Sequence, residues 1–224
     1  AHIDFWTVVA ERRETLLALI DKHHDTSAFE RARTLAWTQA QVQLRHLDID
    51  LEEAADFQRL AAPILYSNAR FRPPSEALKR GLSVQSNLWP MGISGDLPIV
   101  LLRLGDLEEM AWLKTMLRAH EYWRAKGLGV DLVILNDRAH SYLQELQDAI
   151  DTAVRSNRPP AHVDGHLPMG SVYTLRANQL SLASHELLLA VARVVLTARK
   201  GSLPAQLDAL LAKPPADPQD DASS

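Results

Sequence analysis

The sequence predicts an α/β protein in which an N-terminal helical layer precedes a small three-stranded parallel sheet with helices on both faces. The strongest indication is a short apolar run at residues 98–104, a helical pattern at 107–126 and a second apolar run at 130–136. Two apolar runs joined by an amphipathic helix are typical of a βαβ unit, whose parallel strands are buried on both faces. A third short run at residues 171–175 completes the predicted sheet.

Further helices are expected on both sides of this sheet. Gly127 and Gly129 end the helix that joins the first two strands. Apolar residues at helical spacing predict helices at 141–156, 186–199 and 203–211, and Ser181 and Ser184 are candidate caps for the second of these. The proline-containing segment 157–170 is expected to be a loop.

The first eighty residues are expected to be helical, after an initial strand. Residues 11–24, 28–46, 51–65 and 75–80 carry helical patterns, and Asp25 precedes the second as a candidate cap. The predicted division is a strand within residues 1–10, a helical layer at 11–80 and an α/β domain at 81–212. A disordered linker is expected at 213–224, where prolines, aspartates and serines cannot form a core.

The initial strand pattern, residues 3–9, has two interpretations. Ile3, Phe5 and Thr7 alternate with Asp4 and Trp6. An isolated strand leaves its backbone groups unpaired, so it would either join the distant sheet as an edge strand or be the last strand of another sheet. We favour the second interpretation, in which the other strands of that sheet lie outside this segment.

The composition and charge of the chain argue against several classes of protein. The net charge is −4 and the pI is about 6.1, which gives no support for a nucleic-acid surface. There is no cysteine, so disulfides and thiolate metal sites are excluded. No apolar run is long enough to span a membrane, and the first residues do not form a signal peptide.

Trp89 and Asp96 are the candidate substrate-binding residues. They lie in the loop 87–96, where Gly92, Gly95 and Asp96 form a Gly-x-x-Gly-Asp turn immediately before the first strand. Phosphate-binding loops follow a strand and open a helix, so this turn is on the wrong side for phosphate. One interpretation is a structural turn with Trp89 packed inward; in the other, Trp89 stacks on a sugar ring whose hydroxyls donate to Asp96.

The remaining polar clusters have structural explanations. His162, Asp164 and His166 alternate in the loop and lack an evident further ligand, so we expect no metal there. The favourable interaction with a helix dipole explains His23 and His24 at the end of a predicted helix. Ion pairs on a helix surface and aromatic residues in the core explain five consecutive residues of another predicted helix. These are His120, Glu121, Tyr122, Trp123 and Arg124.

Four long strings of the sequence resemble cyclic β-1,2-glucan synthase. They are RTLAWTQAQVQLRHL (33–47), SNLWPMGISGDLPIVLLRLGD (86–106), LRAHEYWRAKGLGVDLVILND (117–137) and VARVVLTARKGSLPAQL (191–207). The likeness extends from Trp6 to Leu207 and implies a segment near the phosphorylase-type module of glycoside hydrolase family 94. It also implies that the segment follows a β-sandwich, whose last strand would be residues 3–9, and precedes another sandwich. The family's membrane-bound synthase domain and the (α/α)6 barrel with its catalytic acid have no counterpart here, so no catalytic residue is transferred.

Two classes of function follow. The resemblance implies a non-catalytic interdomain module of an enzyme that makes and trims β-1,2-glucan. Its partners would be the flanking domains of the same polypeptide, and the loop 87–96 is where it would touch β-glucan, if it does so. The segment would then be cytoplasmic, with its parent enzyme at the bacterial inner membrane. The alternative is a small self-contained enzyme or ligand-binding domain using the strand ends near Leu104, Asn136 and Leu175. No cofactor is expected in either case.

Overall fold

A computed structural model describes residues 7–138, 143–157 and 170–212 of the chain. The chain divides into two compact units, residues 1–48 and 49–224. Within the described part, no helix combines the length and the apolar character that crossing a membrane would require.

The first unit contains two helices, α1 (Arg13–His23) and α2 (Thr26–His46). Both were predicted, and Asp25 caps α2 as expected, because its carboxylate accepts a 2.7 Å hydrogen bond from the amide of Ala28. Hydrogen bonds from the Ser27 hydroxyl and that amide lower the pKa of Asp25. The described residues 7–10 form no strand, whereas residues 3–6 of the predicted strand lie outside the described range.

The second unit is built on four parallel strands in the order β3-β2-β1-β4. They are β1 (Ile99–Leu104), β2 (Asp131–Asn136), β3 (Val172–Arg176) and β4 (Val194–Thr197). The register pairs Ile99 with Asp131 and Leu132 with Val172. The prediction of a parallel βαβ unit with a third parallel strand is therefore confirmed.

The prediction of three strands was wrong, because β4 lies inside the helix expected at residues 186–199. The actual helix α7 (Leu182–Val191) ends early, and Ala192 is already extended. The amide of Arg193 then donates to the carbonyl of Ile99, and Val194 and Leu196 become fully buried beside β1. The free edge of β1 and the β-branched residues of this segment together outweigh its helical pattern.

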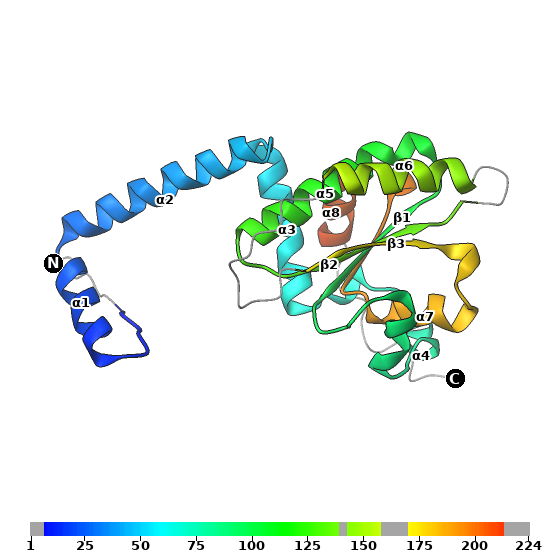
Figure 1. Ribbon diagram of the computed structural model, residues 1–224, viewed down its shortest axis with the longest axis horizontal. Coiled ribbons are helices and arrows are strands. Elements are labelled where there is room, and N and C mark those ends of the chain that lie inside the picture. The colour runs from blue at the N-terminus through cyan, green and yellow to red at the C-terminus, as the bar shows by residue number, and fades with distance from the viewer. Residues whose placement is uncertain (1–6, 139–142, 158–169, 213–224) are drawn as a thin grey trace. The chain divides into compact units, whose positions relative to one another are not determined.

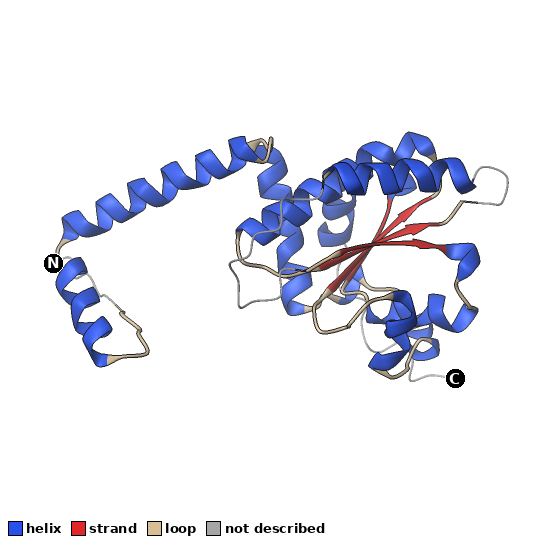
Figure 2. Cartoon of the chain, in the orientation of Figure 1, coloured by secondary structure: helices blue, strands red, loops and turns tan. Residues whose placement is uncertain are grey.

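Helices pack on both faces of the sheet, as predicted (Figures 1 and 2). The helices α5 (Met110–Ala125) and α6 (Leu143–Ser156) lie on one face, and α7 lies on the other together with α4 (Ser75–Arg80). Right-handed crossovers explain this arrangement. The connections from β1 to β2 and from β2 to β3 run in one direction along the sheet, and the connection from β3 to β4 runs in the opposite direction. The helix in that last connection therefore lies on the opposite face. Short 3-10 helices fill the connections: η1 (Ala69–Phe71), η2 (Gln85–Met91), η3 (Leu107–Glu109), η5 (Ala177–Gln179) and η6 (Ala198–Lys200).

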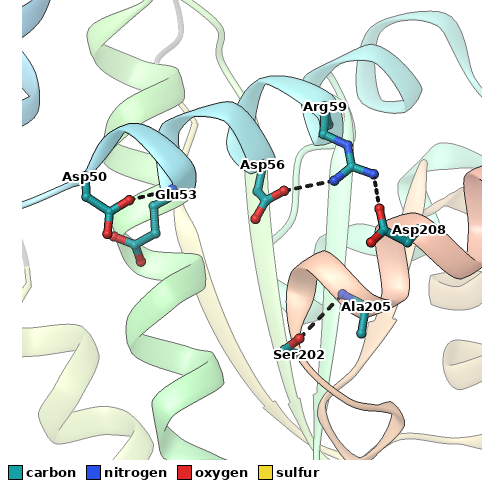
Figure 3. A network of polar contacts seen from close by, with 7 residues as sticks. All are labelled: Asp50, Glu53, Asp56, Arg59, Ser202, Ala205 and Asp208. Carbon is teal, nitrogen blue, oxygen red and sulfur yellow. Dashed lines mark hydrogen bonds and ion pairs between the residues drawn. The ribbon is translucent and has the colours of Figure 1, made fainter.

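The helix α3 (Leu51–Tyr66) belongs to the second unit and packs beside α5 and α8 (Leu203–Ala212). Its predicted core residues Phe57 and Leu60 are fully buried, whereas Ala55 is exposed. Arg59 donates to Asp56 in the same helix and, at 2.5 Å, to Asp208 of α8 (Figure 3). The hydrogen bond that Arg59 donates to Asp208 is the main cause of the raised pKa of Arg59.

Trp123 of α5 joins two helices of this layer. It is 1% exposed, and its Nε1 donates a 2.9 Å hydrogen bond to the carbonyl of Phe57 in α3. We expect Trp123→Ala to lower the free energy of unfolding by about 3–5 kcal/mol, because it opens a cavity and leaves the Phe57 carbonyl without this donor. Chemical denaturation measures the loss. Trp37→Ala is the control, since Trp37 is 67% exposed and its removal should change stability by less than about 0.5 kcal/mol. Similar losses in the two variants would contradict the role of Trp123.

Candidate functional site

The short helix η2 presents three different faces. A 3-10 helix has three residues per turn, so residues three apart lie on the same face. The core face carries Leu88, which is 2% exposed, and Met91, which packs against the same core cluster. The side face carries Asn87 and Pro90, and the outer face carries Trp89.

Trp89 is 65% exposed to solvent. It therefore does not pack inward, and Leu88 instead anchors this segment to the core. The sequence pattern alone left both orientations open, because residues 87–96 were expected to be a loop without a defined period. The 3-10 geometry separates the two neighbours, turning Leu88 inward and leaving Trp89 at the surface.

The glycine turn after η2 is held firmly. Gly92 and Gly95 have φ angles of 77° and 79°, so both occupy the left-handed region that favours glycine. The side-chain amide of Gln85 donates to the carbonyl of Ser94 at 2.8 Å and to the carboxylate of Asp96 at 3.1 Å. Both glycines therefore occupy positions where the backbone favours glycine, and Gln85 holds the exposed Asp96 in place.

Two residues that the sequence interpretation missed lie beside this turn. Asp131, the first residue of β2, is 2% exposed and accepts a 3.0 Å hydrogen bond from the amide of Ser171. Its other carboxylate oxygen has no hydrogen-bond partner among the described residues. Tyr173 of β3 lies next to Gly92, 4.0 Å from the position that a Cβ would take there. Only the strand register brings these residues to the turn.

Burial and the nearby charges shift the ionisation of both residues. Burial raises the pKa of the Asp131 carboxyl, and the negative charge of Asp96 raises it further. The Ser171 amide and the positive charge of His120 act in the opposite direction. Burial also raises the pKa of Tyr173, with a smaller contribution from Asp131.

The surface around η2 suits a ligand that carries many hydroxyl groups. An exposed indole can stack on the apolar face of a sugar ring, and a fixed carboxylate can accept hydrogen bonds from its hydroxyls. Among the described residues, no three His, Asp or Glu side chains lie close enough to hold a metal ion. The candidates His162, Asp164 and His166 lie outside the described residues.

The other polar groups that stood out in the sequence have local partners. His120 is buried, with Nε2 lying 2.9 Å from the carbonyl of Val130. Glu121 forms an ion pair with Arg124 at 3.2 Å. His24 lies at the end of α1, with Nδ1 2.5 Å from the carbonyl of Asp21. These contacts agree with the structural explanation of each group.

The carboxyl ends of the strands form the alternative site. The order β3-β2-β1-β4 reverses direction between β1 and β4, which is where open α/β sheets usually bind ligands. There the amide of Gly105 donates to the carboxylate of Glu109 at 2.7 Å. Arg103 pairs with Asp137 at 2.5 Å. These pairs engage part of this edge, and the Nε of Arg103 is buried without a hydrogen-bond partner among the described residues.

The buried carboxyl of Asp131 predicts a measurable pH effect. Its pKa in the folded protein lies above the ordinary value of 3.8, so its ionisation destabilises the fold as pH rises through the folded pKa. Asp131→Asn removes this ionisation and keeps an oxygen for the Ser171 amide. We expect the variant to gain stability relative to the natural chain as pH is raised from about 3.8 to neutrality. Denaturation midpoints at several pH values test this, with the exposed Asp21→Asn as control. A stability difference independent of pH would contradict it.

Comparison with known proteins gives one informative relative. No protein-family model matches the chain. The chain is 37% identical over 203 residues to cyclic beta-(1,2)-glucan synthase NdvB of Rhizobium meliloti (strain 1021). The match covers 91% of this chain and 7% of that protein. The chain is therefore homologous to a small part of a cyclic β-1,2-glucan synthase.

Proposed function

We propose that this chain is a non-catalytic interdomain module of a cyclic β-1,2-glucan synthase-like enzyme and that it contacts the glucan through the outer face of η2. The homology to part of such a synthase supports the first half of the proposal. The observation that carries the second half is the exposure of Trp89 on η2, in the same loop region as Asp96, whose carboxylate accepts a hydrogen bond from Gln85.

The position of Trp89 fits sugar stacking better than it fits packing. Leu88 already supplies the anchor for η2, and Trp89 remains 65% exposed. A rigid aromatic ring loses little conformational freedom when a ligand binds, because the short helix and its glycine turn already fix the backbone. Asp96 lies in the same turn and would accept hydroxyl protons from the ring or its neighbour.

The absence of catalysis is proposed from the carboxylates beside the turn. Glycoside chemistry usually requires two carboxyl groups facing the bond that is broken. Asp96 is exposed, but Asp131 is 2% exposed and bonded to the Ser171 amide, so a substrate has no access to it. The module would therefore position glucan or neighbouring domains.

The wider setting is also part of the proposal. The parent enzyme would make and trim β-1,2-glucan, with this segment near its phosphorylase-type module of glycoside hydrolase family 94. The flanking domains of the same polypeptide would be its partners, and the parent would act at the bacterial inner membrane. In the alternative, a self-contained ligand-binding domain or enzyme would use the strand ends near Leu104, Asn136 and Leu175.

Glucan binding by the whole chain tests the proposal. We expect linear β-1,2-glucan to bind, and Trp89→Ala to weaken this binding about fivefold to tenfold, the equivalent of about 1.0–1.4 kcal/mol. Isothermal titration calorimetry measures the affinity. Since Trp89 is exposed, the variant should keep the melting temperature of the natural chain.

The matched control is Trp37→Ala, which removes another exposed tryptophan, 67% exposed, from α2. It should leave glucan affinity unchanged. Equal affinity of the Trp89→Ala variant and the natural chain would overturn the proposed contact, and so would an equal loss in the two variants.

Catalytic silence is a separate expectation. The purified chain should neither phosphorolyse β-1,2-glucan nor transfer glucose from a nucleotide donor, because the sequence offers no nucleophile, base or phosphate-binding motif with convincing spacing. Product analysis after prolonged incubation gives the measurement. Turnover that is retained through purification and lost on Asp96→Asn would show that the module is an enzyme.

A further inference from the structure

A pocket opens beside η2, on the side face that carries Asn87 and Pro90. The end of α4, residues 81–83 and the first turns of α7 complete its wall. Its volume is about 260 Å³. Sites for drug-sized molecules begin at roughly 300 Å³, so this pocket suits a ligand of about one ring.

Charge in the pocket is largely compensated. The only charged side chain in its described lining is that of Arg80, at the end of α4. Its Nε donates to the carboxylate of Glu186 in α7 at 2.8 Å. An anionic ligand would have to compete with this carboxylate, so the pocket favours a neutral ligand.

The polar groups of the lining are hydroxyls and an amide. The side-chain amide of Asn87 donates to the hydroxyl of Ser83 at 2.5 Å, which leaves the Asn87 carbonyl free to accept and the Ser83 hydrogen free to donate. Ser184 adds another hydroxyl, and Pro90 and Leu187 supply apolar wall. Hydroxyl and amide groups beside apolar surface match the alternating polar edges and apolar faces of a pyranose.

We propose that this pocket binds one glucose-sized ring of the same glucan chain that stacks on Trp89. This inference rests on the proposed function and adds a second contact to it. The outer and side faces of η2 adjoin each other around one short helix, because residues 87, 89 and 90 lie within a single turn. A glucan lying across η2 would place one ring on the indole and a further ring in the pocket.

A variant that fills the pocket provides the test. Ala183, an exposed residue in the first turn of α7, lines the pocket, and Ala183→Phe would place an aromatic ring in its volume. We expect this variant to bind linear β-1,2-glucan at least about tenfold more weakly by calorimetry. The β-1,2-linked glucose disaccharide should shift the amide resonances of Gly81 and Ser184 in the natural chain, and not in the variant.

The control is Ala205→Phe, which places the same ring on another exposed alanine in the first turn of a ten-residue helix. It should bind glucan as the natural chain does. If Ala183→Phe fails to fold by thermal denaturation, Asn87→Ala replaces it and should weaken binding by removing the acceptor. A pocket-filled or Asn87-truncated variant with full affinity would overturn the pocket assignment.

Three further outcomes separate the causes of failure. If glucan binds and depends on Trp89 but not on Ala183, the pocket assignment fails and the proposed function stands. If the natural chain binds no glucan, both fail. If inorganic phosphate shifts the resonances of Gly81 and Ser184 and the disaccharide does not, the pocket is an anion site and the assignment to sugar is overturned.

Discussion

The rest of the second unit depends on the burial of the apolar residues in its two central strands. Val100, Leu101 and Leu102 of β1 and their neighbours in β2 have no exposed surface. Strands buried on both faces require an apolar layer on each side, and right-handed crossovers determine which helices supply it. The helices α5 and α6 cover one face. On the other face α7 leaves room that η2 fills with Leu88 and Met91.

The candidate site is a consequence of this packing. A 3-10 helix that turns one face to the core must expose the other two, and on η2 these carry Trp89 on one side and Asn87 with Pro90 on the other. The turn at Gly92 and Gly95 then returns the chain toward β1 and brings Asp96 close to Gln85. The residues that connect α4 to the sheet therefore also create a surface of η2 that a ligand can reach.

Sequence patterns predicted the elements better than their contacts. The apolar runs and the helix between them were correct, because two buried strands and an amphipathic crossover leave strong periodicities. The strand β4 was missed because its four residues continue the helical spacing of α7, and the free edge of β1 that helps to favour the extended form is a tertiary feature. The proximity of Asp131 and Tyr173 to the turn depends on the register of the strands. The exposure of Trp89 depends on the three-residue period of a 3-10 helix, and η2 is too short for that period to be recognised in the sequence.

In and beside η2, the side chains that stabilise the fold differ from those proposed to contact a ligand. Leu88 contributes apolar burial to the core, whereas Trp89 and Asp96 are exposed and contribute little to it. The backbone that carries Trp89 is already ordered. The protein therefore loses little conformational freedom when a ligand binds to this ring, which favours recognition. Asp131 differs, because its buried carboxyl lowers stability when ionised and no ligand can reach it. Its environment therefore affects the pH dependence of the fold, while recognition depends on the surface residues of η2.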